Sequence, residues 1–370
     1  MSPQQYQPAW GDPGVTELLQ IQETSINLPA ATGGAQTRTL QRSGFLKRLR
    51  FQNQSQTVFS GTLGTHNKSA YGPLGGAINN IKVVANGQIP LVDLSGLGMT
   101  IYNEIQNRDG GTLARPAFTA GLGILESAAP TQYDAAAVAT CTAIFPFEIQ
   151  FALPVNIKGQ ITELGLWLLQ NQSIDVGVQV AFNPISSATA TNDAVWNGSA
   201  TVVSTPNLAN NFLNIERELY AIPNDPNTYP NLAWAHQVVE YVVPFTGNFS
   251  RFAIPRAGML LRAIVHTLDT SNAAVEATDI SALKWIYGSN ETPISRPGWA
   301  LNLEYFQDYG RSPVKGCTVL DFYKWGDNGL KLVKDTESLA NLRLETSYTA
   351  TAAGTQRIIL DRLIPVLTTR

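Results

Sequence analysis

The sequence is short of charge. Asp, Glu, Lys and Arg make up 14% of the 370 residues, well under the ~25% that is usual in soluble proteins. A chain with so few charges is expected to have a surface that is largely neutral or covered by partner molecules. The net charge of −3 gives no reason to expect nucleic acid binding through bulk electrostatics. We therefore expect no sequence-specific nucleic acid binding, and any basic patch must be local.

Residues that carry chemistry are also scarce. Two cysteines do not make a disulfide framework in a chain of this length. The three histidines, His66, His236 and His266, are far apart, and none stands at metal-ligand spacing with another His, Cys or carboxylate. We therefore expect no metal, no cofactor and no catalytic residue. No pair of acids is singled out as a glycosidase pair, and we interpret the following acids as ordinary surface groups: Asp93, Glu104, Glu148 and Glu163.

Long apolar runs are absent from the sequence. No run approaches the ~18 residues that a membrane-spanning helix needs. The first residues, MSPQQYQPAWGDPGV, have no basic start followed by an apolar stretch, so we expect no secretory signal.

What the chain does contain is an internal repeat, and a repeat of this kind decides the architecture of a fold. The stretch RSGFLKRLRF (42–51) aligns without a gap on RAGMLLRAIV (256–265), with Gly44 on Gly258 at an offset of 258−44 = 214. A second block, 81–106, repeats as 283–307, with Gly96 on Gly298 at an offset of 298−96 = 202. The order of the blocks is kept, and this indicates an ancient duplication.

A third block extends the repeat. Residues 141–150 align on 317–326, with Cys141 on Cys317 at an offset of 317−141 = 176. At the same offset, residues 163–170 align on 339–346. Matched positions in two separate copies favour two unpaired buried thiols over a bond between them.

The repeated units have the residue pattern of β-structure. Short runs rich in Val, Ile, Phe and Thr alternate with Gly, Asn, Pro and Ser, which is typical of a sandwich or jelly roll. Helices are expected over 95–106 and 297–307, because Ser95 and the pair Arg296-Pro297 are start signals. The fold class that we predict is all-β, with two tandem eight-stranded jelly rolls and short helices in the connecting loops.

The chain divides into four parts on this interpretation. Residues 1–39 form an N-terminal arm, 40–183 the first jelly roll, 184–233 a connecting loop and 234–370 the second jelly roll. The arm is rich in Gln, Pro, Thr and Gly, and we expect it to gain order by docking on another surface. Its apolar anchors are Trp10, Leu18, Leu19 and Ile21.

A single basic cluster stands out, formed by Lys47, Arg48 and Arg50. Strand alternation would place Lys47 and Leu49 on one face and the two arginines on the other. The cluster could face phosphate, either of an anionic membrane or of packaged DNA. It could equally be a strand end that pairs with acids of a neighbouring subunit, which we favour slightly.

Three classes of function remain open. A shell-forming structural protein ranks first, a carbohydrate-binding or receptor-binding virion component second, and a two-sandwich glycan-processing enzyme a distant third. The binding protein would need exposed aromatic platforms, yet three tryptophans stand within apolar strands and are expected in the core: Trp167, Trp285 and Trp325. Only four others could be exposed: Trp10, Trp196, Trp234 and Trp299.

With the duplicated unit laid out, the chain resembles a family. The residues that carry the resemblance are GFLKRLRFQNQSQTVFSGTL, YGPLGGAINNIKVVANGQIPLVDLSGLGMTIYN and LANLRLETSYTATAAGTQRIILDRLIPV. Over residues 40–370, their order and length are similar to the double jelly-roll major capsid proteins of tailless icosahedral double-stranded DNA viruses, the tectivirus type related to adenovirus hexon.

The resemblance implies a function and partners. It implies a non-enzymatic homotrimer whose six jelly rolls form a pseudo-hexagonal capsomer of the virion shell, assembled in the host cytoplasm. The implied partners are neighbouring capsomers, vertex and minor capsid proteins, and the lipids of an internal membrane. The arm would lie at the inner face or clasp a neighbour, so deleting residues 1–30 is expected to spare the trimer and impair shell assembly.

Overall fold

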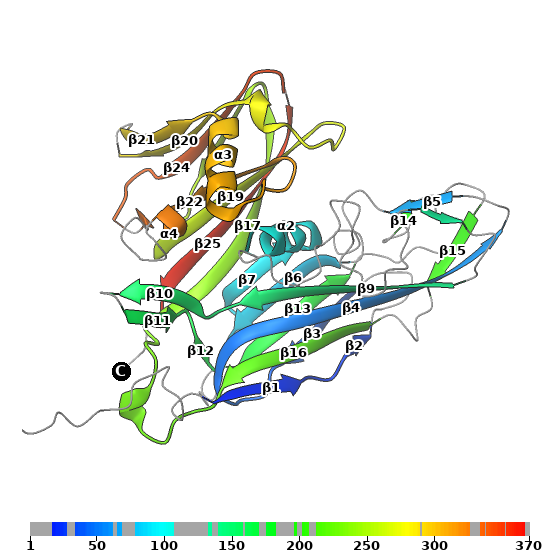
Figure 1. Cartoon of the computed structure of the whole chain (residues 1–370), viewed down its shortest axis with the longest axis vertical. Helices are drawn as coiled ribbons and strands as arrows, with labels where there is room; N and C mark the ends of the chain where they lie inside the picture. The colour runs from blue at the N-terminus through cyan, green and yellow to red at the C-terminus, as the bar shows by residue number, and fades with distance from the viewer. Residues whose placement is uncertain are drawn as a thin grey trace, which may run out of the picture.

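A computed structural model describes most of the chain. The described residues are 17–27, 34–61, 65–68, 78–106, 132–134, 140–157, 160–169, 175–182, 196–197, 202–206, 212–288, 291–325, 334–336, 338–351 and 353–366. They form two all-β units that lie one above the other in Figure 1.

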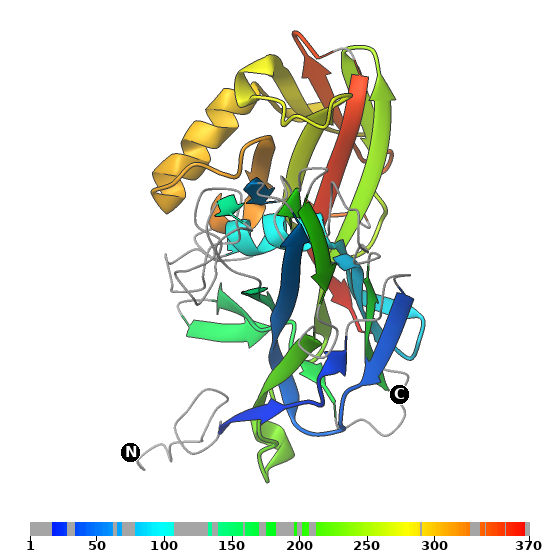
Figure 2. The ribbon, with the colours of Figure 1, turned by 90° about the vertical axis from the view of Figure 1, so that its right-hand side faces the viewer.

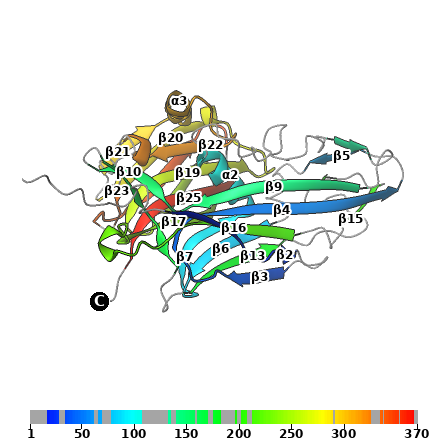
Figure 3. The ribbon, with the colours of Figure 1, turned by 60° about the horizontal axis from the view of Figure 1, so that its bottom comes forward.

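The first unit is an eight-stranded jelly roll made of two four-stranded sheets. One sheet has the order β1-β16-β4-β9, with bounds Leu18–Gln22, Phe212–Tyr220, Phe45–Gly61 and Thr140–Gln150. The other has the order β3-β13-β6-β7, with bounds Gly34–Thr39, Val176–Phe182, Ile78–Ala85 and Ile89–Ser95. Helix α2 (Gly96–Gln106) follows β7. Figure 3 shows β9, β4 and β16 running side by side.

The second unit repeats this arrangement strand for strand. Its sheets have the orders β17-β25-β19-β22 and β18-β24-β20-β21. The bounds of the first are Trp234–Thr246, Ala353–Pro365, Met259–Asp269 and Cys317–Asp321. Those of the second are Phe249–Ala253, Arg343–Tyr348, Ile280–Tyr287 and Glu291–Arg296. Helix α3 (Gly298–Tyr309) follows β21 as α2 follows β7.

Short elements decorate the two rolls. They are β2 (Ile26–Asn27), β5 (Thr65–Lys68), β8 (Gln132–Asp134), β10 (Leu153–Ile157), β11 (Gln160–Leu164), β12 (Trp167–Leu168), β14 (Trp196–Asn197), β15 (Val202–Pro206), β23 (Lys334–Asp335), α4 (Phe322–Trp325) and the 3-10 turns Pro226–Thr228 and Ala277–Asp279. The prediction of two jelly rolls with short helices between strands is confirmed.

Strand registers confirm the first two blocks of the repeat. Gly44 and Gly258 each precede the matching strand, β4 or β19, and Gly96 and Gly298 each begin the matching helix. In both rolls the hairpin before the helix is bulged at the same place, after Val83 in β6 and after Trp285 in β20. A bulge is kept only where the ladder around it is kept, so the two hairpins share one register.

The third block of the repeat is wrong in register. Cys141 and Cys317 lie on equivalent strands, β9 and β22, but Cys141 is opposite Thr57 and Cys317 is opposite His266. At the offset of 214 that joins β4 to β19, the residue equivalent to His266 is Gln52, which is opposite Pro146. The match of 163–170 on 339–346 also fails, because the strand equivalent to β24 is β13. Loops of different length precede these strands, so sequence similarity alone did not determine which residues are equivalent in the two rolls.

The expected arm is wrong for residues 18–27 and 34–39. Strand β1 pairs along its length with β16, and β3 pairs with β13. Both supply edge strands of the first roll, which would otherwise have six. The expected connecting loop 184–233 likewise contains β16, which pairs with β4 from Phe212 to Tyr220. Backbone hydrogen bonds with distant strands therefore decide where the roll begins and ends.

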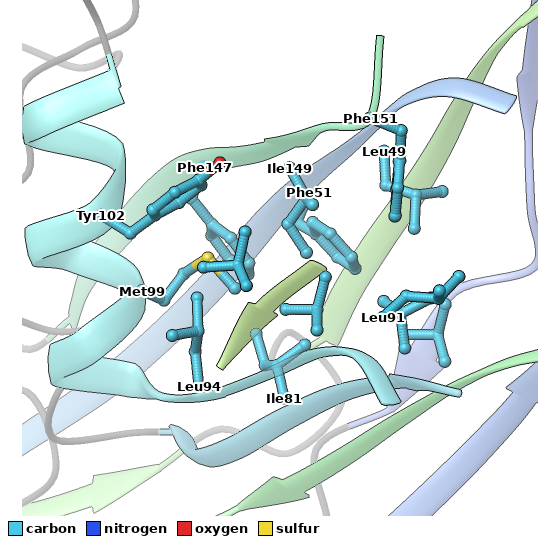
Figure 4. Close-up of a cluster of buried hydrophobic side chains, with 14 of the residues drawn as sticks. Leu49, Phe51, Ile81, Leu91, Leu94, Met99, Tyr102, Phe147, Ile149 and Phe151 are labelled. Atoms are coloured by element: carbon cyan, nitrogen blue, oxygen red, sulfur yellow. The ribbon is translucent and has the colours of Figure 1, made fainter. Parts of the chain in front are cut away.

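The first roll has a continuous apolar core between its sheets. Figure 4 shows side chains of β4, β6, β7, β9 and α2 converging in it. The rings of Phe51 and Phe147 stack with centroids 4.7 Å apart. The core of the second roll surrounds Trp285, whose ring meets Phe322 edge-on at 5.2 Å. Burial of Trp167 and Trp285 confirms the prediction for these two tryptophans, and the side chain of Trp325 is outside the described residues.

Candidate assembly surface

The two rolls share an apolar interface. The outer face of the β17-β25-β19-β22 sheet contributes Val238, Ile264 and Ile359 to the same buried cluster as Met99 and Tyr102 of α2. Figure 1 shows α2 at the junction of the two rolls. Because these faces are buried together, the second roll docks on the groove that β7 and α2 form in the first.

A strand pair crosses the same junction. β17 runs parallel to β7, with Val238 opposite Val92 and Val239 opposite Asp93. One sheet of each roll thereby joins into a continuous sheet with the order β22-β19-β25-β17-β7-β6-β13-β3. The junction is thus built from main-chain pairing as well as from side-chain packing.

A buried polar network lies in this interface. The Arg262 guanidinium donates to Asp321 at 3.1 Å and to the Gln106 side chain of α2 at 3.3 Å, and it lies 3.9 Å from Asp361. Burial alone would lower the pKa of Arg262, but the charges of Asp321 and Asp361 outweigh it and raise that pKa. Arg262 therefore stays cationic between its two carboxylates.

His236 links the network to the first roll. Its Nδ1 lies 2.6 Å from the main-chain oxygen of Gln150, and its Nε2 lies 2.5 Å from Asp361. Both neighbours are acceptors, whereas a neutral imidazole donates from only one nitrogen. Which of the two contacts the neutral ring donates to depends on its tautomer.

The basic cluster of the first roll is paired within its own subunit. Lys47 lies 3.0 Å from Glu218, and Arg48 contacts both Glu218 and, at 3.0 Å, Glu148. Arg50 lies 3.1 Å from Glu216, 3.3 Å from Glu218 and 3.9 Å from Glu148. The acids come from β9 and β16, the strands on either side of β4.

A bulge overturns the predicted alternation of this cluster. Arg48 is opposite Glu218 and Leu46 is opposite Leu219, so Lys47 is the extra residue between them. Both Lys47 and Arg48 reach Glu218, and they therefore lie on one face of the sheet. Simple strand alternation would have placed them on opposite faces.

Burial and neighbouring charges shift the pKa values of the acids in the cluster. Burial would raise the pKa of Glu218, but hydrogen bonds from Arg48 and Lys47 outweigh it and lower that pKa. For Glu148 burial dominates and raises the pKa, against the attraction of Arg48 and Arg50. Glu218 is thus the fixed anion that holds the cations on this face.

The cluster and the buried network occupy equivalent places. Leu261 is the extra residue of a bulge in β19, and the next residue, Arg262, is opposite Asp361. In the same way, Lys47 is the extra residue of the bulge in β4, and the next residue, Arg48, is opposite Glu218. The Arg262 side chain is 1% exposed and that of Arg48 is 21% exposed. The difference arises because the first roll covers Arg262, whereas no described residue covers the matching face around Arg48.

The anchors expected in the arm fall into three groups. Leu19 and Ile21 are partly buried and pack against the core of the first roll. Leu18 is among the exposed large apolar residues, and Trp10 is outside the described residues. Leu19 and Ile21 therefore anchor their own roll, which replaces the expectation that they dock elsewhere.

Helix α3 presents an apolar surface that the sequence only partly indicated. Trp299, Leu303 and Phe306 recur at helical spacing and are all exposed. The possible exposure of Trp299 was foreseen, but the stripe was missed because its three residues suit a buried helix face equally well. Figure 2 shows α3 on the outer flank of the second roll.

The described residues contain little that resembles a reaction centre. Among the residues that it describes, no group of three His, Cys, Asp or Glu could hold a metal ion. Each candidate acid has its own partner: Asp93 with Lys82, Glu104 with Arg311, Glu148 with Arg48, and Glu163 with the Tyr220 hydroxyl. Cys317 is buried without a disulfide, and burial raises its pKa. The side chains of Cys141 and His66 are outside the described residues.

None of the helices in the described ranges is long and apolar enough to cross a bilayer.

Comparison with known proteins gives a match at the level of structure. No family model and no curated protein matches the sequence. A chain of the atomic structure of Sulfolobus Turreted Icosahedral Virus is similar with a TM-score of 0.65 and 15% identity, over 94% of this chain and 91% of that one. The major capsid protein P2 from bacteriophage PM2 has a TM-score of 0.54 and 10% identity, over 95% and 99%.

A third match comes from the PBCV-1 virus capsid. Its TM-score is 0.61 at 10% identity, and it covers 97% of this chain and 96% of that one. Matches of such length include both rolls, their order and the junction between them. The chain therefore has the double jelly-roll fold seen in viral major capsid proteins.

Proposed function

We propose that this chain is the major capsid protein of an icosahedral virus and has a structural, not an enzymatic, role. The observation that carries the proposal is the likeness to capsid chains over nearly the full length of both partners.

The assembly that we propose is a homotrimer with six jelly rolls in a pseudo-hexagonal block. Three chains with two similar rolls each approximate sixfold symmetry, and heterologous contacts between rolls close the ring. A charge content of 14% suits a chain whose flanks are covered by copies of itself. Such blocks would then tile the shell with neighbouring capsomers, vertex proteins and minor capsid proteins.

The division of the chain that we propose follows strand pairing. The first roll runs from about residue 18 to 220 and the second from 234 to 365, with 221–233 between them. The acids Glu148, Glu216 and Glu218 neutralise Lys47, Arg48 and Arg50, which favours a subunit contact over lipid or DNA phosphate for this cluster. The virion shell is the proposed location, with assembly in the host cytoplasm.

Sedimentation of the purified full-length chain tests the trimer. We expect a species of three times the chain mass of 40.1 kDa at micromolar concentration, and pseudo-hexagonal particles in negative-stain images. A monomer that forms no regular assembly under any condition would contradict the proposed function.

A further inference from the structure

The second roll has an open groove between β21 and α3. It has a volume of about 380 Å³ and is lined by Pro293, Ile294, Arg296, Glu304, Gln307 and Asp308. Glu304 pairs with Arg296 across it. Asp308 has no ion pair within the described part of the chain, so this carboxylate faces the groove without a cation.

The matching groove of the first roll is filled. At the offset of 202 that joins the two helices, its lining residues are Leu91, Val92, Leu94, Tyr102, Ile105 and Gln106. The first five are buried, but Leu91 and Leu94 point into the core of the first roll itself (Figure 4), so the evidence for an occupant comes from Val92 and Gln106. Val92 pairs with Val238 of β17, and Gln106 accepts a hydrogen bond from Arg262. The second roll is therefore the occupant of this groove.

Exposure of the two helices differs in the same way. Leu97 and Ile101 of α2 are 6% and 0% exposed, whereas Trp299 and Leu303, at the same positions of α3, are 54% and 49% exposed. A stripe of this kind is unusual on a monomer unless it meets a partner. Within the described residues, no roll is docked on the groove beside this stripe, whereas the second roll is docked on the matching groove of the first.

Two sheet edges are open as well. In the described residues no strand pairs with the outer edge of β21, and none pairs with the outer edge of β1. Their counterparts β7 and β17 pair with each other. Unpaired edges of this kind are templates for addition of a strand from another chain.

The outer face of the β1-β16-β4-β9 sheet is the counterpart of the face that fills the first groove. Arg48 is at the position of Arg262, and Glu218 is at that of Asp361. Gln20 is opposite Glu218 as Val238 is opposite Asp361. If the docking within the chain were repeated between two chains, this face would be the one that enters the groove.

Polarity changes together on both sides of the contact. On the helix, Tyr102, Ile105 and Gln106 are replaced by Glu304, Gln307 and Asp308. On the docking face, Ile264 and Ile359 are replaced by Arg50 and Glu216. At these positions both surfaces are more polar than their counterparts, as suits surfaces that meet water before assembly. Asp308 at the position of Gln106 would face Arg48 at the position of Arg262.

We propose that the groove between β21 and α3 receives a second copy of this chain, which docks the outer face of its β1-β16-β4-β9 sheet there. In that contact β21 pairs in parallel with β1 of the copy, with Ile294 opposite Gln20, and Asp308 faces Arg48. The inference rests on the proposed trimer and names the surfaces that close it. In such a trimer, the contact between rolls of neighbouring subunits repeats the contact between the two rolls of one subunit.

Several intrachain contacts have no counterpart in the proposed interface. The bond from the Gln237 side chain to the Pro90 carbonyl is one, because Leu19 is at the position of Gln237. The bond between Ser95 and Glu240 is another. The Ser95 main-chain N–H donates to Glu240 at 2.6 Å. The equivalent of Ser95 is Pro297, which has no N–H, and the equivalent of Glu240 is Gln22. The N–H donor is absent at Pro297. Gln22 can still accept through its amide oxygen, and this exposed side chain can bond to water instead.

Cysteine cross-linking tests the strand pair. In the double variant Gln20→Cys with Ile294→Cys, the paired Cα atoms would be about 5 Å apart, within disulfide range. Mild oxidation of the full-length protein should give covalent dimers and trimers on a non-reducing gel. The control Leu18→Cys with Ile294→Cys is two residues out of register, about 8 Å apart, and should not cross-link.

Two surface variants test the groove. We expect Asp308→Lys, which would face Arg48, and Leu303→Asp to raise the subunit concentration at half dissociation about tenfold or more. Phe249→Asp is the matched control, because Phe249 is exposed on β18 at the opposite edge of the same sheet. Circular dichroism and thermal melting of each variant show whether the subunit remains folded.

The outcomes separate the two proposals. Register-specific cross-links and weakened trimers in folded variants support the docking that we propose. A wild-type trimer that Asp308→Lys and Leu303→Asp leave intact, without cross-links, overturns the docking and leaves the capsid function standing. A wild-type chain that stays monomeric and forms no regular assembly under any condition overturns both.

Discussion

Gly44 and Gly258 lie 258−44 = 214 residues apart and occupy the same place in the two jelly rolls. Both have positive φ, 65° and 58°, immediately before β4 and β19. A Cβ at either position would meet a main-chain oxygen of the neighbouring strand, that of Tyr220 or of Leu363. The two copies have kept glycine because each strand begins under a carbonyl group that leaves no room for a side chain.

Gly258→Ala should destabilise the second roll strongly. The substitution adds a left-handed backbone penalty of roughly 1–2 kcal/mol to a clash with main-chain atoms that cannot rotate away, so we expect a total loss of about 3 kcal/mol or more in the free energy of unfolding. Gly288→Ala is the control, since Gly288 has a φ of 61° and nothing within 4 Å of the added Cβ. Denaturant midpoints should shift far less for the control, and equal shifts would contradict the role of the Leu363 carbonyl.

Removing the Arg262 side chain should be more damaging than removing an exposed arginine. Arg262→Leu leaves Asp321 and Asp361 buried without their cation, and breaking such a pair costs roughly 3–5 kcal/mol. The control is Arg42→Leu, because the Arg42–Asp175 pair is exposed at 46% and 58% and such pairs contribute about 0–1 kcal/mol. Similar melting temperatures for the two variants would show that the inter-roll network adds little to stability.

His266 should make stability fall on mild acidification. Burial, with a smaller contribution from Arg357, lowers its pKa from 6.5 to about 4. The unfolded chain therefore binds a proton between these values that the folded chain refuses. Stability is complete above pH 6.5 and declines as the pH falls toward 4, by up to about 3 kcal/mol.

The variant His266→Leu isolates this effect from the titration of carboxylates. Urea midpoints measured between pH 7 and pH 4.5 should decline less steeply for the variant than for the wild-type chain. Parallel declines would mean that other groups cause the acid sensitivity.

Strand β1 should be needed for the fold of the subunit. The variant Leu19→Asp with Ile21→Asp puts two carboxylates against the core of the first roll, and we expect loss of soluble folded protein or a melting temperature lower by several degrees. The control Gln22→Asp changes an exposed position of the same strand and should be near neutral. A folded, trimeric double variant would return residues 18–22 to the status of a separate arm.

Local patterns in the sequence were enough to reveal the duplication, the jelly-roll class and the two helix starts. Gly44 and Gly258 were matched because a backbone constraint selects one residue type. Gly96 and Gly298 were matched because each follows a short hairpin of fixed length. Ser95 was identified as a start signal, and its side chain accepts from the Gly98 N–H at 2.9 Å. These features depend on neighbours within a few residues.

Features that depend on distant strands were decided by the tertiary structure. The register of Cys141, the place of β1 and β16 in the first roll, and the partners of Lys47, Arg48 and Arg50 all follow from pairing across long loops. Whether the matching groups are buried, like Arg262, or partly exposed, like Arg48, depends on which roll lies over them. The sequence alone determined that one unit occurs twice, whereas only the packing of the two units showed that one docking face is covered and the other is left open.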